Sequence, residues 1–405
     1  MPDFERELQS ELESIRASGL RRELRRVDSA QGPRIAIGGR EYLNFSSNDY
    51  LGFANHPALK EAAIKAVEKF GAGSGASRLI CGSLAPHHEL EEALAAFKGT
   101  EASLTFSTGY AAALGAVCSL VGKDDAIILD KLVHASIVDA ARLSGAKLRV
   151  FRHNDLDDLE NKLKWARKVQ SPRSKVQGRL PRTLVVTESV FSMDGDLALL
   201  RDIVELKDRY GASLMVDEAH ATGLFGAGRR GLAEAYELAE RVEVQMGTLG
   251  KAIGASGGYV CGNRALIDLL VNRARSFIFS TAPVPAAAAA ATAGIKLVQS
   301  AEGEGRRVRL WSIIDAVKNA LTGVWKLPVV QSAIIPLIVG DESKAVEIAA
   351  QLRKRGIFIP AIRYPTVARG KARLRLTLTA PHSAEDIREL VAALKSILQH
   401  VSGTS

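Results

Sequence analysis

Two short segments of the chain carry residues whose types and spacing could do chemistry. The apolar run 214–216 is followed by Asp217, Glu218, Ala219 and His220, and Lys251 ends the segment Thr-Leu-Gly-Lys. An acid and a histidine at one strand end, with a lysine at another, suit a cofactor that has an aldehyde and a pyridine ring. The pattern predicts a site for pyridoxal 5'-phosphate. The letters D-E-A-H also spell a metal-binding motif of ATP-driven helicases.

Three competing motifs are poorly supported by their surroundings. A helicase needs a phosphate loop of the form G-x-x-x-x-G-K-[ST], and the chain contains none. Residues 254–258 fit the serine-hydrolase pattern G-x-S-x-G, but they precede a predicted strand where the motif should follow one. Residues 71–76 fit a relaxed dinucleotide-binding pattern, but a helical segment, 59–70, stands where a strand is required.

The cofactor hypothesis assigns several residues at once. Lys251 would form an imine with the aldehyde, which requires burial or a neighbouring charge to lower its pKa. Asp217 would keep the pyridine nitrogen protonated, so that the ring accepts electrons from a substrate carbanion, and His220 would bond the phenolic oxygen. A phosphate favours neutral donors at a helix start. Those predicted here are Thr248 and the backbone amides of Gly109 and Tyr110.

The elements that must position these residues alternate between strands and helices. An α/β fold with a mostly parallel sheet, covered by helices on both faces, is therefore predicted. Ligands of such sheets bind at the carboxyl ends of strands. The predicted strands are 104–107, 126–130, 148–153, 183–188, 214–217, 242–247, 258–261 and 277–280, with helical segments between them such as 199–210.

The pattern changes after residue 280 and predicts a second, smaller α+β domain. Its predicted helices are 285–298, 343–355 and 383–399, and its predicted strands are 334–339, 356–362 and the alternating segment 373–379. We therefore divide the chain into an N-terminal segment, 1–46, a large cofactor-binding domain, 47–284, and a small C-terminal domain, 285–405.

Composition narrows the functional classes. The net charge is +9, from 54 basic and 45 acidic residues, and part of it lies in the polar stretch 162–182. Aromatic residues make up only 5%, so a nucleic-acid groove is not expected. The uncharged segment 102–122 contains a turn at 107–109 and is expected to be core, not a membrane span. Three separated cysteines and an acidic start predict a cytoplasmic protein without a metal site.

Five segments together resemble a known family. They are 42–52, 73–78, 188–196, 216–220 and 248–251, and they are similar to the α-oxoamine synthases, which are fold-type I pyridoxal phosphate enzymes. The resemblance spans nearly the whole chain and implies a seven-stranded type of sheet. It also implies the decarboxylative condensation of an amino acid with an acyl thioester. Segments 332–340, 361–366 and 373–379 most resemble the branch that joins L-alanine to a pimeloyl thioester, carried by coenzyme A or an acyl carrier protein, in biotin biosynthesis.

The resemblance also implies residue roles. His134 would stack on the cofactor ring, Ser192 would lie near its phenolic oxygen, and Arg375 would hold the alanine carboxylate by a two-pronged contact. Ser280 and Thr281 would reach the phosphate of the other subunit, which implies a homodimer with shared active sites. The remaining residues expected to bind substrate are Arg21, Asn48, Ser74 and Thr366.

Other functions stay open at this point. A relative that uses glycine, such as a 5-aminolevulinate synthase or a 2-amino-3-ketobutyrate ligase, would carry much of the same site. Another pyridoxal phosphate reaction, such as transamination or lyase chemistry, is a second alternative. A hydrolase or binding protein without this cofactor is a third. The basic stretch 162–182 is interpreted as an attractor for the phosphates of coenzyme A or for an acidic carrier.

Overall fold

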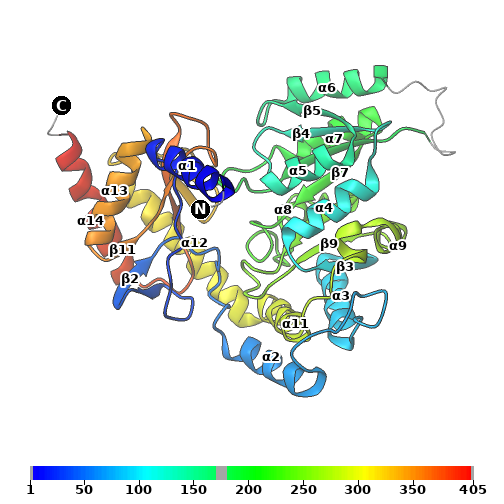
Figure 1. Ribbon diagram of the computed structural model, residues 1–405, viewed down its shortest axis with the longest axis horizontal. Helices are drawn as coiled ribbons and strands as arrows, with labels where there is room; N and C mark the ends of the chain where they lie inside the picture. The colour runs from blue at the N-terminus through cyan, green and yellow to red at the C-terminus, as the bar shows by residue number, and fades with distance from the viewer. Residues whose placement is uncertain (1–2, 170–179, 403–405) are drawn as a thin grey trace.

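A computed structural model describes residues 3–169 and 180–402, and it places the secondary structure in two regions (Figure 1). One region holds a large sheet flanked by helices, and the other holds two small sheets. The helix α12 (Ala301–Leu321) extends between them. Residues 170–179, which belong to the predicted basic stretch, lie outside the described residues. The predicted limits of the domains remain a prediction.

The large sheet has seven strands in the order β3-β9-β8-β7-β6-β4-β5. Only β9 runs antiparallel to its neighbours, so the sheet is mostly parallel, as predicted. The strands are β3 (Ala102–Phe106), β4 (Ala126–Asp130), β5 (Lys147–Phe151), β6 (Thr183–Glu188), β7 (Ser213–Asp217), β8 (Val244–Thr248) and β9 (Gly258–Gly262).

Helices cover both faces of this sheet because its strands are apolar on both sides. In β4, Ile127 and Leu129 face one core, whereas Ala126 and Ile128 face the other. The first core includes α4 (Gly109–Leu120), α5 (Ala135–Ser144), α9 (Arg264–Arg273) and α10 (Arg275–Ile278). The second includes α2 (Pro57–Phe70), α3 (Ala85–Lys98), α6 (Leu156–Val169), α7 (Leu200–Tyr210), α8 (Leu232–Ala235) and α11 (Pro285–Gln299).

The smaller region joins both ends of the chain. One sheet has the order β1-β2-β11, and its strand β2 pairs in parallel with β11, so residues near the N-terminus pair with residues near the C-terminus. The other has the order β10-β13-β12 and is antiparallel. The strands are β1 (Arg34–Ile37), β2 (Arg40–Asn44), β10 (Ile334–Gly340), β11 (Ile357–Phe358), β12 (Ala361–Ile362) and β13 (Ala372–Thr377), and the helices are α1 (Asp3–Ala17), α13 (Glu342–Lys354) and α14 (Ala384–Ser402). A short 3-10 helix, Ala239–Arg241, precedes β8 of the large sheet.

Two predicted strands are wrong. Residues 277–280 do not form a strand, because the amides of Phe277 and Ile278 both donate to the carbonyl of Ala274 and close the turn of α10. An apolar run this short has no period that separates strand from helix. Residues 356–362 do not form one strand but two, β11 and β12, which belong to different sheets. Pro360 lies between them and cannot donate to a sheet ladder.

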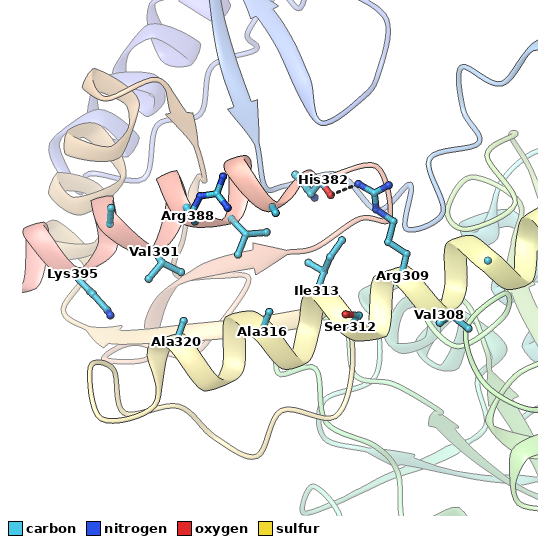
Figure 2. A pocket seen from close by; sticks show the side chains of 14 residues that line it. Val308, Arg309, Ser312, Ile313, Ala316, Ala320, His382, Arg388, Val391 and Lys395 are labelled. Carbon is cyan, nitrogen blue, oxygen red and sulfur yellow. Dashed lines mark hydrogen bonds between the residues drawn. The ribbon is translucent and has the colours of Figure 1, made fainter.

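One cavity lies away from the strand ends. It is a groove of about 900 Å³ between α12 and α14, and Figure 2 shows apolar side chains of both helices facing across it. At one end Arg309 donates to the carbonyl of His382 at 3.0 Å. None of the predicted site residues lines this groove. Among the described residues, no helix has the length and apolar character that a membrane span requires.

Candidate active site

The candidate site begins at the carboxyl ends of three neighbouring strands. In the sheet register Glu188 at the end of β6 lies opposite Asp217 at the end of β7, and Asp217 lies opposite Met246 in β8. Parallel strands end at one edge of a sheet, so these side chains converge there. The predicted acid therefore stands beside a second carboxyl group, Glu188.

A cavity of about 200 Å³ opens at this edge. It gathers seven of the predicted site residues, from four different segments of the chain. Its lining residues are Gly109, Tyr110, His134, Ser136, Glu188, Asp217, Ala219, His220, Met246, Thr248 and Lys251. No group of three or more histidine, cysteine, aspartate and glutamate side chains in the described parts of the chain is arranged to hold a metal ion.

Lys251 lies in the loop between β8 and β9 and projects into the cavity. Burial lowers the pKa of its amine to about 8, although the charges of Asp217 and Glu188 oppose that change. Its Nζ lies 2.8 Å from Nε2 of His220. An amine with this pKa is partly neutral near pH 7, so it can act as a nucleophile and as a base.

His220 connects Lys251 to the segment 48–50. Its Nδ1 lies 2.6 Å from the hydroxyl of Tyr50, which is itself buried. Burial and the charge of Lys251 hold the pKa of His220 well below its usual value, so the ring is neutral. A neutral ring donates through one nitrogen and accepts through the other. A proton on Nδ1 leaves Nε2 free to accept from Lys251.

Arg375 reaches the same network from the smaller region. Its Nη1 donates to Asn48 Oδ1 at 3.1 Å and to Thr377 Oγ1 at 2.9 Å, and its Nε donates to the carbonyl of Ser192 at 2.6 Å. The hydroxyl of Tyr50 also interacts with Arg375, and this interaction opposes the rise in pKa that burial causes in Tyr50. A guanidinium carries five N–H donors, and Nε and Nη1 account for three of them in these bonds to Ser192, Asn48 and Thr377.

The two strand-end carboxyl groups differ in their bonding. Asp217 Oδ1 accepts from the amide of Ala219 at 2.9 Å, and burial raises its pKa while the charge of Lys251 lowers it. Burial and the charge of Asp217 raise the pKa of Glu188 well above its usual value. Glu188 Oε2 accepts from the amide of Ser192 at 3.2 Å, but Glu188 Oε1 is buried without a partner among the described residues. Of the two carboxyl groups, Asp217 is therefore the one that ionises more readily.

The first turn of α4 supplies the cavity with amide donors. Thr108 caps the helix by accepting from the amide of Ala111 at 3.0 Å, and no acceptor in the described structure meets the amides of Gly109 and Tyr110. The strand β9 approaches this turn closely: a Cβ on Gly258 would lie 2.4 Å from the carbonyl oxygen of Thr108. A glycine is therefore required for β9 to support the helix start at this distance.

Thr248 and His134 border the cavity on two sides. The hydroxyl of Thr248 donates to the carbonyl of Gly257 at 2.9 Å and accepts from the amide of Gly250 at 3.3 Å, which fixes the loop before Lys251. His134 caps α5, because its Nδ1 accepts from the amide of Ser136 at 3.2 Å. Its ring is exposed and lines the cavity, so one face is available for stacking.

Eight predicted site residues do not line the cavity. Ser192, Asn48 and Arg375 lie in the hydrogen-bond network described above, and the other five lie elsewhere. Ser74 donates to the carbonyl of Pro283 at 2.6 Å, close to Ser280 and to Thr281, which pairs with Ser77 in an isolated bridge. Arg21 and Thr366 lie on a second surface, where Arg22 donates to Thr366 Oγ1 at 3.4 Å and Arg363 donates to the carbonyl of Arg21 at 3.3 Å. Their predicted roles stay predictions.

Three residues of the site were missed from the sequence. Glu188 is the last residue of the buried strand β6, next to Asp217. An acid at the end of a predicted strand is the signal that could have identified it as a site residue. Tyr50 is part of the segment 42–52 but was given no role. Its contact with His220 spans 170 residues of sequence, and no spacing predicts it. Gly258 was assigned only to a strand.

Known proteins match this chain over most of its length. Residues 40–394 match the family described as aminotransferase class I and II. The chain is 48% identical to an 8-amino-7-oxononanoate synthase of Anaeromyxobacter dehalogenans over 96% of its length and 94% of that protein. It is 46% identical to the synthase of the same name from Geobacter sulfurreducens, over 97% of this chain and 98% of that one.

Solved structures give a similar result. A serine palmitoyltransferase from S. paucimobilis with a bound PLP–myriocin aldimine superposes with a TM-score of 0.89 at 31% identity, over 98% of each chain. An 8-amino-7-oxononanoate synthase from Francisella tularensis superposes with a TM-score of 0.74 at 26% identity, over 89% of this chain and 99% of that one.

Proposed function

Because this chain belongs to the aminotransferase class I and II family and is related to 8-amino-7-oxononanoate synthases, we propose that it condenses L-alanine with a pimeloyl thioester in biotin biosynthesis. The reaction releases carbon dioxide and the thiol, and its cofactor is pyridoxal 5'-phosphate. The thiol belongs to coenzyme A or to an acyl carrier protein. The observation that carries the proposal is the placement of Lys251, with its lowered pKa, beside Asp217 and His220 in one cavity.

The donors and acceptors of the cavity fit this cofactor. Asp217 would hold the protonated ring nitrogen, and the exposed ring of His134 would cover the face of the pyridine. His220 and Ser192 would lie on the side of the phenolic oxygen. The phosphate would meet Thr248 and the free amides of Gly109 and Tyr110 at the positive end of α4. When bound, the cofactor supplies a ring that accepts the electrons of a carbanion at the α carbon.

Lys251 then moves protons at the α carbon of the substrate. Its pKa of about 8 lies close to neutral pH, where a base is both available and strong enough to act. Neutral His220 accepts from Nζ and keeps the amine aimed into the cavity. Asp217 stays ionised beside a protonated ring nitrogen, because an adjacent positive charge favours the carboxylate.

Arg375 holds the carboxylate of alanine. Three of its hydrogen bonds go to Ser192, Asn48 and Thr377, and they fix the plane of the guanidinium before substrate arrives. The N–H groups of Nη2 supply the charge-assisted contact. Asn48, which bonds Arg375, would lie next to the bound substrate.

The acyl substrate would approach from the surface that carries Arg21 and Thr366, and Ser74 would lie on its path. In a homodimer with shared sites, Ser280 and Thr281 of one subunit would reach the phosphate in the other. These two residues are only half-buried or exposed in the single chain, which supports a role at a subunit contact.

A substrate panel tests the proposal. Purified holoenzyme is mixed with alanine, glycine or serine and with pimeloyl, acetyl, succinyl or palmitoyl thioesters, and thiol release is recorded. We expect the highest kcat/KM with alanine and a pimeloyl thioester. The serine–palmitoyl pair belongs in the panel because the solved serine palmitoyltransferases share this fold at 31% identity. A preference for any other pair would refute the substrate assignment.

Replacing Lys251 tests the cofactor chemistry itself. The Lys251→Ala protein should fold and bind the cofactor without a covalent bond, so its visible absorbance should match that of the free aldehyde. Turnover should fall by several orders of magnitude, because the nucleophile and base are the same residue. Normal turnover in this variant would contradict the role of Lys251.

A further inference from the structure

His153 lies outside the cavity and joins two carboxylates from different parts of the fold. Its Nδ1 lies 3.0 Å from Oδ1 of Asp130, the last residue of β4, and its Nε2 lies 2.7 Å from Oδ2 of Asp196. Asp130 is buried and also accepts from the amides of Leu132 at 2.8 Å and Asn154 at 3.0 Å. Because an imidazolium has a donor on each ring nitrogen, a charged ring can bond Asp130 through Nδ1 and Asp196 through Nε2.

The second contact fixes the charge of the ring. Asp196 Oδ2 also accepts, so both ring nitrogens donate and His153 is an imidazolium. Hydrogen bonds to the two aspartates raise the pKa of His153 to about 10 against the cost of burial. The charged groups that face the ring are Asp130 from β4 and Asp196 from the loop after β6; Phe191 packs edge-on against it.

Asp196 belongs to a loop, residues 189–198, that spans from the large sheet to the smaller region. The stem of the loop is tied to β7, because the amide of Ser189 donates to the carbonyl of Asp217 at 2.9 Å. At the other end, Ser332 donates to the carbonyl of Gly195 at 2.7 Å. A Cβ on Gly195 would lie 2.2 Å from the carbonyl oxygen of Ile334, so the loop packs closely against β10.

The same loop presents acceptors at Ser192, Met193 and Asp194 to the arginines of β13. Arg375 donates to the carbonyl of Ser192 at 2.6 Å, and Arg373 donates to Asp194 at 2.6 Å. The loop therefore supplies one of the three acceptors that fix the Arg375 guanidinium. His153 holds this loop to the ends of β4 and β5 at Asp196.

Asn154 adds a second attachment at the same place. Its φ of 52° is in the left-handed region, which asparagine tolerates better than most residues. From that conformation its amide group donates to the carbonyl of Leu197 at 3.0 Å and accepts from the amide of Leu199 at 3.3 Å. Residues 153 and 154 together therefore bond the chain at Asp196, Leu197 and Leu199.

We propose that His153, as an imidazolium, is a positioning residue that clamps the 189–198 loop and thereby orients Arg375 for the carboxylate of the amino acid substrate. It touches neither substrate nor cofactor and acts through Asp196, the Ser192 carbonyl and Arg375 in turn. The inference rests on the proposed function in one respect, namely that Arg375 binds the substrate carboxylate.

Two amide variants separate the two contacts of the ring. In His153→Asn, the amide nitrogen can replace Nδ1 toward Asp130 but falls short of Asp196, so the loop is released. In His153→Gln, the longer side chain can still reach Asp196. Alanine affinity is measured with the holoenzyme, from the change in cofactor absorbance as alanine is added. We expect the Kd of alanine to rise about ten-fold in His153→Asn, as for an interaction of about 1.4 kcal/mol, and clearly less in His153→Gln.

The controls test whether the effect runs through the loop. His88→Asn, at an exposed histidine that contacts Ser83, should leave the Kd unchanged. Cofactor affinity should be unchanged in all these variants. In an Arg375→Lys background, His153→Asn should have little further effect, because the residue it positions is already altered. An additive loss in that background, or a His153→Asn Kd within two-fold of wild type, would overturn the proposal.

A pH profile and hydrogen exchange supply readouts that a general loss of packing would not reproduce. Asp196→Asn removes one partner, so the pKa of His153 should fall toward its ordinary value of about 6.5. The ratio of the alanine Kd of Asp196→Asn to that of wild type should then grow between pH 6 and pH 8, and a ratio constant with pH would contradict the role of the charge.

Amide exchange at 189–198 should be faster in His153→Asn than in wild type, and equal rates would refute the clamp. If wild type binds no alanine, the proposed function fails while the exchange result still decides the clamp.

Discussion

The substitution Arg375→Lys should weaken alanine binding far more than it slows the chemistry. Lysine keeps the positive charge but has no planar fork of donors, so it cannot bond Ser192, Asn48 and the substrate carboxylate at once. The variant therefore loses a positioned hydrogen bond to the substrate carboxylate but keeps the positive charge. The buried site remains cationic, and the cofactor-binding residues are untouched.

The magnitude follows from the bonds that Arg375 already makes. Nε and Nη1 of Arg375 are engaged by protein acceptors, so we assign the carboxylate to Nη2. A charge-assisted hydrogen bond contributes about 1.5–3 kcal/mol, which corresponds to an increase of about 10- to 150-fold in the Kd of alanine. The carboxylate is held both before and during proton removal, so KM should rise more than kcat falls.

The assay is an alanine titration of the holoenzyme followed by cofactor absorbance, with steady-state kinetics beside it. Arg309→Lys is a matched control, because Arg309 lies in the remote groove and donates to the carbonyl of His382. This control should keep wild-type affinity. A Kd for Arg375→Lys within about three-fold of wild type would refute the assignment of Arg375 to the carboxylate, since one charge-assisted bond exceeds that change.

Two further predictions concern the cofactor. The pKa of Lys251 is lowered from 10.5 to about 8, so its neutral fraction rises about ten-fold per pH unit below pH 8. The rate at which the apoprotein captures the aldehyde covalently, measured by stopped-flow absorbance, should rise in the same way and level off above pH 8. A midpoint near 10.5 would contradict this prediction. Gly258→Ala should weaken cofactor binding about five-fold or more, because overpacking costs at least about 1 kcal/mol and the new Cβ would lie 2.6 Å from the amide nitrogen of Gly109. Gly122→Ala, where a Cβ meets nothing within 4 Å, is the control in the same dialysis measurement, and equal affinities would show that the start of α4 tolerates the change.

Strand-end chemistry was predictable from the sequence because its cause is local. The run 214–216 is apolar and short, so the polar residues after it must lie at a sheet edge, and Asp217 is found there. The same reasoning placed Thr248 and Lys251. The parallel sheet followed from the alternation of strands and helices, which is confirmed by the strand order. Only β9 departs from the parallel direction, and no sequence pattern marked it.

The alternating segment 373–379 shows where a correct local prediction stops. Alternation predicts a strand with one polar face, and β13 is that strand, yet all six of its residues are buried. The polar face is covered because Arg373 and Arg375 meet the 189–198 loop, which supplies acceptors at Ser192 and Asp194. The sequence indicates the strand but not the segment that covers it.

The network from Lys251 to Arg375 explains why the partners of a site are harder to predict than its chemical groups. Lys251, His220, Tyr50, Asn48 and Arg375 come from four segments, and three contacts between these segments span 31, 170 and 327 residues of sequence. The first contact joins neighbouring strand ends, which a sheet order predicts. The other two depend on how residues 42–52 and β13 pack against the large sheet, and packing is set by the summed burial of the whole core. A residue such as Tyr50 therefore becomes a candidate only once the fold places its hydroxyl 2.6 Å from a ring that faces the reactive amine.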